Sequence, residues 1–477
     1  MVNDEFEHFL DGANVVKLKD ISLKIGSGST PRGGESAYID EREVFAFVRS
    51  QNVYDFRFNT DGIRFITDGD AHKLKGVHLQ RDDILLNITG DGLTFARCCL
   101  VPESILPAAV NQHVCIIRVD KEKCLPSYLL AFLCLPETKK YIENFNAGGS
   151  RRAITKGHIE SFEIPLLPMT IQKVISRNAE DILCKQKLNN QINQTLEQMA
   201  QTLFKSWFVD FDPVIDNALD MGNAIPEGFE ARAERRKAVR ESAEFKPLPD
   251  DVRKLFPNEF DESELGWVPH GWATTQLSDI TTELRRGISP KYLDEGGIQV
   301  INQKCIRNHD INFDLCRRNN PELRKITGRE IEVGDVLVNS TGVGTLGRVA
   351  QVTYLDEITV VDSHVTVVRP NEEKCLKYTF GQLMLAHEKR IEALGEGSTG
   401  QTELSRKILS EQKVVVPPIS LAEVVEPLFA SYTSKKVSLN KSISSLTKLR
   451  DTLLPKLLSG EIDLENVQVE AAKAIVE

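Results

Sequence analysis

Few residues in this 477-residue sequence have the types and spacing that catalysis needs. Residues 342–349, Gly-Val-Gly-Thr-Leu-Gly-Arg-Val, have the glycine spacing of a phosphate-binding loop. They lack the Lys-Ser/Thr pair that would reach the phosphates and a metal ion. His113 and His364 stand in strand-like runs without a neighbouring acid or nucleophile motif, which favours structural histidines. We therefore predict no catalytic residue.

The cysteines and histidines also lack the spacing of metal ligands. The nine histidines are scattered, and the nine cysteines contain no Cys-x-x-Cys. Cys98 and Cys99 are adjacent and would face opposite ways on a strand, so apolar packing is favoured over zinc binding. We predict no metal site.

Small polar loops offer a different chemistry, the recognition of a ligand by hydrogen bonds. Two such loops occur early in the chain, at residues 26–32 and 147–156, and two later, at 285–291 and 395–402. Their glycines allow close approach to a backbone, Ser, Thr and main-chain N–H groups can hold phosphate oxygens, and Arg, Asn and Gln can read base edges. Solvated turns are the alternative for any single residue, but the repeated set favours a ligand surface.

These loops recur because the sequence contains one domain twice. Matching segments lie 251 or 252 positions apart and keep one register over much of the chain: residues 83–92 with 335–344, 110–114 with 361–365, and 123–125 with 374–376. A duplicated domain suggests pseudo-twofold symmetry.

The two copies differ most where we expect sequence reading. The similar loops around Asn87/Thr89 and Asn339/Thr341 are expected to be scaffold, because residues that read two different half-sites should differ. The divergent stretches are residues 49–57 against 301–308, and 151–156 against 398–402. The predicted DNA-binding residues are Ser29, Thr30, Arg32, Arg49, Gln51, Asn52, Ser150, Arg151, Arg152, Lys156, Arg285, Arg286, Lys291, Asn302, Gln303, Lys304, Ser398, Thr399 and Gln401.

A long helix is predicted after each copy, from about residue 170 to 207 and from 420 to 458. Apolar residues recur there at steps of three and four, as a packed helix face requires. At ~1.5 Å per residue each helix would span roughly 55 Å, and two packed helices could hold the copies apart. An ordinary core helix is the alternative. The residues expected to pack between the helices or against a partner are Leu196, Met199, Leu203, Phe204, Leu446, Leu449 and Leu453.

These elements divide the chain into six segments. The charged segment between the copies is expected to be a connector; its mixed-charge middle, residues 230–238, could be helical with a solvated face. The boundaries are 1–169 for the first recognition domain, 170–212 for the first helix, 213–270 for the connector, 271–418 for the second domain, 419–459 for the second helix and 460–477 for an acidic tail.

The composition is that of an ordinary globular protein, with 41 % hydrophobic and 27 % charged residues. The net charge of −10 argues against attraction of DNA over the whole surface, so a partner is expected to supply much of the phosphate contact. No apolar run approaches a membrane span, and the first residues lack a signal-peptide pattern, so we expect a cytoplasmic protein.

Three segments carry a family resemblance. Residues 196–213 end the first helix, 265–272 open the second domain, and 446–462 close the second helix. With them, the chain resembles the specificity subunit of type I restriction–modification systems over nearly its whole length. The resemblance implies an α/β (α+β) fold in which two target recognition domains are separated by two long antiparallel helices.

The resemblance also implies a function without catalysis. Each domain would read half of a bipartite DNA target, and the helices would fix the unread spacer. Two methylation subunits that bind S-adenosylmethionine, and motor-nuclease restriction subunits that use ATP and Mg, would be the partners, so the cofactors would belong to them. A self-contained modification enzyme and a protein-only scaffold are the alternatives; the enzyme would need a cofactor or metal motif that the sequence lacks.

Overall fold

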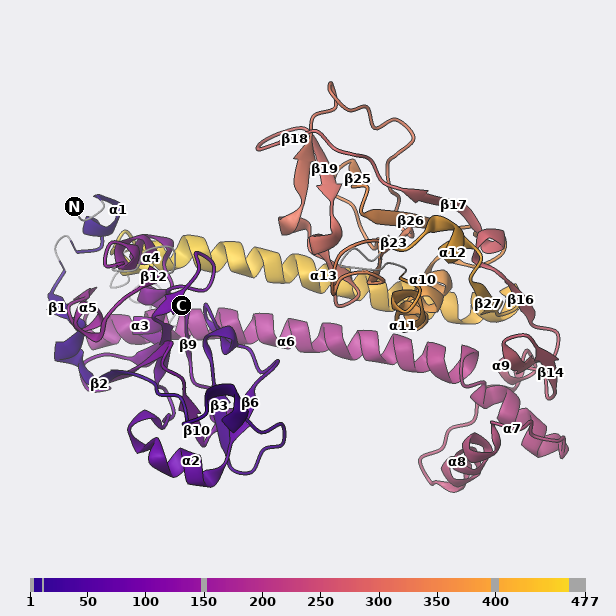
Figure 1. Cartoon of the computed structure of the whole chain (residues 1–477), viewed down its shortest axis with the longest axis horizontal. Helices are drawn as coiled ribbons and strands as arrows, with labels where there is room; N and C mark the ends of the chain where they lie inside the picture. The colour runs from indigo at the N-terminus through magenta and orange to yellow at the C-terminus, as the bar shows by residue number, and fades with distance from the viewer. Residues whose placement is uncertain (1–3, 11–12, 147–151, 396–402, 463–477) are drawn as a thin grey trace, which may run out of the picture. The chain divides into compact units, whose positions relative to one another are not determined.

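The chain forms two units, each built from one copy of the repeat and parts of two long helices. One unit comprises residues 1–189 and 442–477, and the other comprises residues 190–441. The computed structural model describes residues 4–10, 13–146, 152–395 and 403–462 (Figure 1).

The first copy is built on two sheets with apolar residues between them. An antiparallel sheet has the order β2-β11-β7-β9, and a second sheet, β10-β3-β6, contains a parallel pair, β10 with β3. Cys98 and Cys99 of β9 lie in different apolar clusters, as expected for neighbours on a strand. The strands are β2 (Ser22–Ser27), β11 (Val114–Val119), β7 (Ile84–Asn87), β9 (Cys98–Leu100), β10 (Ala108–Val110), β3 (Phe45–Val48) and β6 (Arg64–Ile66).

The second copy repeats this arrangement. Its antiparallel sheet has the order β17-β26-β23-β24, and its other sheet, β18-β22-β19-β25, again contains one parallel pair, β19 with β25. The strands are β17 (Thr281–Arg286), β26 (Val365–Pro370), β23 (Val336–Asn339), β24 (Val349–Gln351), β18 (Tyr292–Leu293), β22 (Arg317–Asn319), β19 (Ile298–Ile301) and β25 (Thr359–Val361). The duplication read from the sequence is therefore a duplication of topology.

Helices and a short strand pair complete each copy in the same order. The elements of the first copy are β1 (Val15–Lys17), α3 (Pro126–Leu133), α4 (Pro136–Glu143), α5 (Lys156–Glu160) and β13 (Glu163–Pro165). Those of the second are β16 (Ala273–Gln276), α10 (Lys377–Ala386), α11 (Glu388–Glu392), α12 (Arg406–Ser410) and β27 (Lys413–Val416). β1 pairs with β13, and β16 pairs with β27, so each domain closes just before its long helix.

Matched polar contacts hold the two scaffolds. The buried Asp83 accepts two hydrogen bonds of 2.7 Å from Arg118, and the buried Asp335 accepts bonds of 2.7 and 2.8 Å from Arg369. These pairs lock β7 to β11 and β23 to β26.

A glycine occupies the same tight position in both copies. A Cβ added at Gly28 would lie 2.1 Å from the Val110 carbonyl oxygen, and one at Gly287 would lie 2.1 Å from the Val361 carbonyl oxygen. Backbone approach within the fold therefore explains these two glycines, rather than approach to a ligand.

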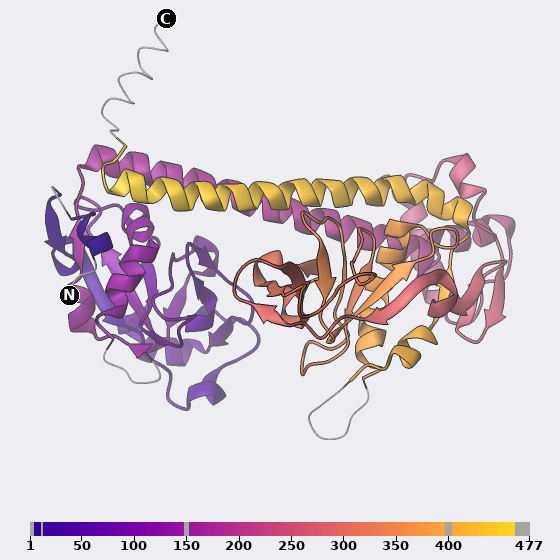
Figure 2. The same ribbon diagram turned by 90° about the horizontal axis from the view of Figure 1, so that it is seen from above.

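The predicted long helices are α6 (Met169–Phe208) and α13 (Ile419–Leu458), each of 40 residues. In the first unit Gln186 donates to Thr447 over 2.7 Å and Asn189 donates to Ser442 over 3.1 Å. In the second unit Asn193 donates to Asn440 over 2.6 Å. Since residue numbers rise along one helix as they fall along the other, the helices are antiparallel in each unit (Figure 2). The buried Asn189 and Asn193 give this part of the contact a polar character.

The predicted packing residues of the helices are only partly confirmed. Phe204 is buried in the second unit's core, Leu203 packs against that core, and Leu453 packs against the core of the first unit. Leu196 and Leu446 are half-buried. Met199 and Leu449 are 46 % and 51 % exposed, so they do not pack between the helices, and contact with a partner remains the prediction for them.

The expected connector is folded: its apolar residues pack into the second unit, and its mixed-charge middle is a helix, as the sequence allowed. Val214 and Phe256 are buried in the core of the second unit together with Trp272. The elements here are α7 (Asp212–Met221), α8 (Glu230–Glu241), α9 (Asp250–Arg253), β14 (Phe260–Ser263) and β15 (Gly266–Pro269).

Paired charges explain why a mixed-charge run is folded here. Arg232 of α8 makes two 2.7 Å bonds to Asp212 of α7, and one turn later Arg236 binds Asp216 in the same way. Both series repeat every four residues, which places each on one helix face. The charges therefore form an ion-pair ladder between two helices. The acidic tail lies outside the described residues after residue 462.

No helix in the described part of the chain is long and apolar enough to cross a membrane.

Candidate nucleic-acid interface

Two matched turns carry the divergent polar residues. The η3 turn is Arg49 with the 3-10 helix η3 (Ser50–Asn52), and the η7 turn is Asn302 with the 3-10 helix η7 (Gln303–Cys305). Each turn follows the strand that pairs in parallel, β3 or β19. The Arg49 N–H donates to Asn52 Oδ1 over 3.0 Å, and the Asn302 N–H donates to Cys305 Sγ over 3.5 Å. The last side chain of each turn thus accepts a hydrogen bond from the first residue and closes the turn.

Asn52 has to be removed from the predicted contact residues. It is fully buried, and its amide donates to the carbonyl oxygens of Asn59 and Asp61 over 3.0 and 3.3 Å. These bonds hold the turn and leave no face for a ligand. Sequence reasoning gave Asn52 a surface role because asparagine is a common reader of adenine.

The other side chains of the two turns are partly held and partly free. Arg49 donates to the Gly62 carbonyl oxygen over 2.7 Å, and Gln303 accepts a 3.2 Å hydrogen bond from Thr341. Gln51 and Lys304 are exposed, and Asn302 is half-buried, with its oxygen accepting from the Lys304 N–H over 2.9 Å. A DNA contact by these five residues remains a prediction.

The glycine-containing loops give a mixed outcome. Ser29, Arg32 and Lys291 are exposed, while Thr30 is half-buried and donates to Gln112. Nothing in these contacts prevents Ser29, Arg32 or Lys291 from meeting a phosphate.

The two predicted arginines of β17 are largely structural. Arg285 is 8 % exposed and donates to the Glu330 carbonyl oxygen over 3.1 Å, so its predicted surface role is wrong. Arg286 donates to the carbonyl oxygens of Ser363 and Leu404 over 3.0 and 2.8 Å and pairs with Glu403 at 2.9 Å. Its charge is already neutralised within the domain.

In the third pair of loops, Arg152 pairs with Glu143, and Lys156 pairs with Glu160 at 3.4 Å. Lys156 is exposed, so this ion pair is weak and can exchange for a phosphate. Ser150, Arg151, Ser398, Thr399 and Gln401 lie outside the described residues.

The matched histidines belong to the scaffold. The hydrogen bond between Thr89 Oγ1 and His113 Nδ1 is 2.7 Å long, and that between Thr341 Oγ1 and His364 Nδ1 is 2.8 Å long. The same contact in both copies supports the structural role expected for these histidines and for the two threonine loops.

The family described as the type I restriction modification DNA specificity domain matches this chain at residues 11–198 and 269–443. The chain belongs to this family. Each matched stretch contains one copy of the domain, so the duplicated α/β fold with two long helices and the resemblance stated from the sequence are both confirmed.

Whole-length relatives carry the same description. The type I restriction enzyme HindI specificity subunit of Haemophilus influenzae is 26 % identical, with 87 % of this chain and 94 % of that protein aligned. The MjaIX specificity subunit of Methanocaldococcus jannaschii is 23 % identical, with 95 % and 94 % aligned. The crystal structure of a type I restriction-modification S subunit from M. genitalium has a TM-score of 0.53 over 94 % of this chain and 96 % of that one, at 13 % identity, and so shows a shared fold.

This member of the DNA specificity family also presents arginines that the sequence prediction missed. The guanidinium carbons of Arg57 and Arg97 lie 4.8 and 4.4 Å from the ring centre of Tyr54. Within the described residues neither arginine has a carboxylate partner, so both charges are available to a phosphate. Arg57 ends the divergent stretch 49–57, although it was not among the residues named there; Arg97 comes just before β9 and gave no signal in the sequence.

The second copy has an open cavity beside the turn at residues 307–309. It measures about 630 Å³, and Arg307 and Arg348 line it together with residues of α6. His309 lies in its wall, with Nδ1 2.8 Å from Glu197 and Nε2 3.1 Å from Glu388. Hydrogen bonds to these two carboxylates raise the pKa of His309 to about 9.

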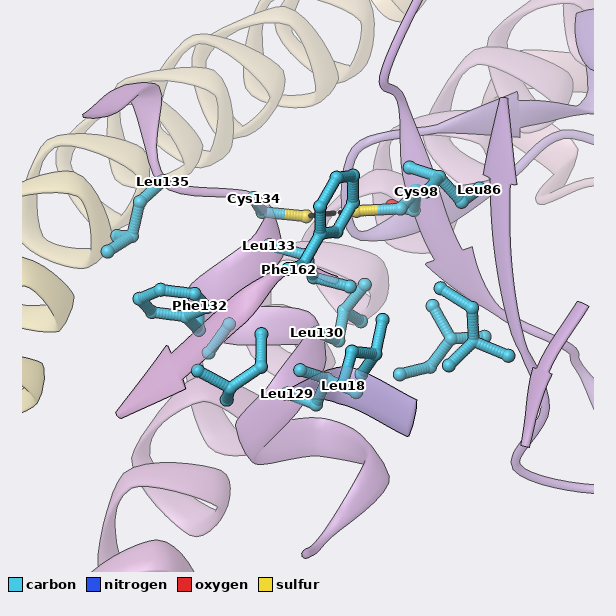
Figure 3. Packing of buried hydrophobic residues seen from close by; sticks show 14 of the residues in the cluster. Leu18, Leu86, Cys98, Leu129, Leu130, Phe132, Leu133, Cys134, Leu135 and Phe162 are labelled. Carbon is cyan, nitrogen blue, oxygen red and sulfur yellow. Dashed lines mark hydrogen bonds between the residues drawn. The ribbon is translucent and has the colours of Figure 1, made fainter. Parts of the chain in front are cut away.

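One cluster in the first copy has the residue types of a metal site. The ligand atoms of Asp55, Cys98 and Cys134 lie within 4.8 Å of one another, and the two sulfurs are 3.4 Å apart (Figure 3). The Lys139 ammonium already pairs with Asp55, and burial holds the pKa of the Cys134 thiol well above its usual value. These contacts favour a packed pair of neutral thiols, as expected for Cys98.

Proposed function

We propose that this chain is a non-catalytic subunit that reads a bipartite DNA target, one half with each copy of its recognition domain. The observation that supports this proposal is the contrast between scaffold and turns. The buried Asp–Arg pairs and the tight glycines are the same in both copies, whereas the η3 turn reads Arg-Ser-Gln-Asn and the η7 turn reads Asn-Gln-Lys-Cys. Two domains that recognise different half-sites need the same fold and different side chains at the DNA-contacting positions.

The turn residues have the chemistry for base recognition. Arg and Lys donate to the O6 and N7 atoms of guanine, and Gln and Asn pair with adenine in the major groove. We assign this role to Arg49 and Gln51 in the first copy and to Asn302, Gln303 and Lys304 in the second. Ser29, Arg32, Lys156 and Lys291 are assigned to the phosphate backbone, which positions the protein without reading sequence.

The long helices are proposed to fix the unread spacer. Each is continuous over 40 residues, or roughly 60 Å. Readers that meet the same side of DNA must keep to its repeat of roughly 34 Å per turn. Adding one helical turn to α6 and the matching turn to α13 is expected to lengthen the spacer and leave both half-sites unchanged; an unaltered spacer would contradict this role.

Partners are proposed to supply catalysis and charge. Two methylation subunits that bind S-adenosylmethionine, and motor-nuclease subunits that use ATP and Mg, would complete the complex, and this chain would hold none of these cofactors. The exposed Met199 and Leu449 are candidate contacts for such a subunit. Because the chain carries a net charge of −10, the partners are expected to provide much of the phosphate attraction. We place this activity in the cytoplasm, with the cell's DNA.

Methylation mapping tests the proposal most directly. The chain is co-expressed with its cognate methylation subunit in a methylation-free host, and modified adenines are located by sequencing. A bipartite motif with a fixed unread gap is the expected result. A stable complex that methylates without a motif would contradict sequence reading, and methyl transfer by this chain alone would contradict the non-catalytic role.

A further inference from the structure

Two cysteines meet beside the η7 turn of the second copy. Cys305 is the last residue of the turn, and Cys316 follows the short η8 helix (Phe313–Leu315). Their sulfur atoms are 3.8 Å apart. Cys305 is fully buried and Cys316 is half-buried, so Cys316 is the more exposed residue of the pair.

The surroundings of Cys305 favour its thiolate. The hydrogen bond from the Cys316 thiol, together with the N–H of Asn302, lowers the pKa of Cys305 in spite of burial. The same contact raises the pKa of Cys316. Thiolate character and access make a cysteine redox-reactive; in this pair Cys305 has the thiolate character and Cys316 the greater exposure, 3.8 Å away.

The fold itself does not require a cysteine at this place. The matched residue of the first copy is Asn52, whose amide closes the η3 turn by hydrogen bonds to Arg49, Asn59 and Asp61. The first copy has a closer thiol pair, Cys98 and Cys134, but both are buried in an apolar core. Cys98 and Cys134 of the first copy are therefore an internal control for the reactivity of Cys305 and Cys316 in the second copy.

We propose that Cys305 and Cys316 form a reversible disulfide that fixes the η7 turn, with a low-molecular-weight disulfide such as oxidised glutathione as the oxidant. Cys316 gives its proton to the Cys305 thiolate, and the Cys316 sulfur attacks one glutathione sulfur. The glutathione S–S bond breaks, and the leaving glutathione takes the proton from Cys305 and departs as a thiol. The Cys305 thiolate then attacks the sulfur of Cys316, a Cys305–Cys316 bond forms, and the second glutathione leaves as a thiol. Two protein thiols are oxidised and one glutathione disulfide is reduced to two thiols, so atoms and electrons balance.

The disulfide would reach the residues assigned to base reading. Bond formation brings the sulfurs from 3.8 Å to about 2.05 Å, which draws the η7 and η8 turns together. Asn302 bridges these turns, since its amide donates to the Leu315 carbonyl oxygen over 3.4 Å. This consequence rests on the proposed function: oxidation is expected to weaken discrimination at the half-site read by the second copy, and to leave the other half-site unchanged.

The chemical step is tested without DNA. The full chain is equilibrated in glutathione buffers of increasing oxidation, free thiols are alkylated, and cross-linked peptides are identified by mass spectrometry. We expect a Cys305–Cys316 link to form reversibly while Cys98 and Cys134 remain alkylatable after denaturation. Cys184, which is exposed on α6, reports that the oxidant has acted. A Cys184–glutathione adduct with both Cys305 and Cys316 still free would overturn the proposal.

The consequence is tested with the assembled methylation complex. Binding to the target and to targets with one half-site altered is compared for the reduced and oxidised complex, and for a Cys316→Ser variant that cannot form the bond. We expect roughly fivefold weaker discrimination at one half-site on oxidation, and no change in the variant. A disulfide that leaves discrimination intact would overturn the effect on the turn. A reduced complex that prefers no sequence would instead overturn the proposed function, and the two failures are distinct.

Discussion

The two copies are attached to the long helices through the same turn but by different chemistry. In the first copy Phe56 lies in the β4–β5 turn with a φ of 59°, and the Arg450 guanidinium of α13 is 4.6 Å from its ring centre. In the second copy His309 lies in the β20–β21 turn, also with a φ of 59°, between Glu197 of α6 and Glu388 of α11. The strands are β4 (Val53–Tyr54), β5 (Arg57–Phe58), β20 (Ile306–Arg307) and β21 (Asp310–Ile311). Duplication has preserved the backbone, and the side chains have diverged to a stacked contact in one unit and an ionic contact in the other.

The largest expected effect tests whether the scaffolds are equivalent. Gly28→Ala and Gly287→Ala would each place a Cβ against a backbone carbonyl oxygen, and each is expected to destabilise its unit by about 3 kcal/mol or more. Urea unfolding of each variant measures the loss. Gly26→Ala is the matched control, because no atom lies within 4 Å of a Cβ added there. A tolerated substitution at one site only would mean that the scaffolds are not equivalent.

The next effect separates the two attachments by pH. The pKa of His309 is raised from 6.5 to about 9, so its stabilisation is fully present below pH 6.5 and is lost as the pH rises through 9. At pH 7 it is worth about 2–3 kcal/mol. The second unit is expected to lose stability between pH 7 and 10, and the first unit's attachment is not. Hydrogen exchange of the β20–β21 and β4–β5 turns across this range measures the difference, and equal loss of protection in both turns would contradict it.

The two glutamates of the same contact give stability the opposite dependence on pH. Burial alone would raise the pKa of Glu197 and Glu388, but the hydrogen bond from His309 lowers the pKa of both overall. Their stabilisation is therefore present above the ordinary pKa of glutamate and is lost as the pH falls below it.

Replacing His309 by the residue of the first copy tests this assignment. His309→Phe removes the imidazolium and leaves Glu388 without its charged partner, while Glu197 keeps Lys436 at 3.1 Å. We expect a loss of about 2 kcal/mol at pH 7 and no loss of stability between pH 7 and 10. His72→Ala, at an exposed histidine of the first copy, should leave the pH profile as it is. A variant that keeps the wild-type alkaline profile would show that another group titrates.

A smaller effect is expected for the stacked attachment. Arg450→Leu keeps most of the apolar stem and removes the charge over Phe56, so the loss should be about 1 kcal/mol and independent of pH from 6 to 10. Thermal unfolding at several pH values measures it. A pH-dependent loss would mean that the contact is not the stacked one.

The smallest effect on stability is expected at the outer side of the two turns. Gln51→Ala and Lys304→Ala remove exposed side chains, and each should change stability by less than about 0.5 kcal/mol. Each should relax the methylation motif in a different half. Unfolding and methylation mapping together check this, and relaxation of the same half by both variants would contradict one reader per copy.

The sequence predicted the features that depend on repeats or regular spacing along the chain. The constant offset between residues 83–92 and 335–344 predicted two copies of one domain, and apolar spacing predicted the long helices α6 and α13. These inferences succeed because a repeat and a helical period are properties of the chain itself.

The tertiary structure alone decided the role of individual polar and apolar residues. Asn52 and Arg285 have the types of DNA-reading residues, but both side chains are buried and donate to neighbouring carbonyl oxygens. The charges of α8 appeared solvated because their partners, Asp212 and Asp216, come from a different helix. Met199 and Leu449 fit the apolar spacing of a packed helix but are exposed, whereas the polar Asn189 and Asn193 are buried where the two helices meet. A side chain's type is written in the sequence, whereas its partners come from segments that only the fold brings together.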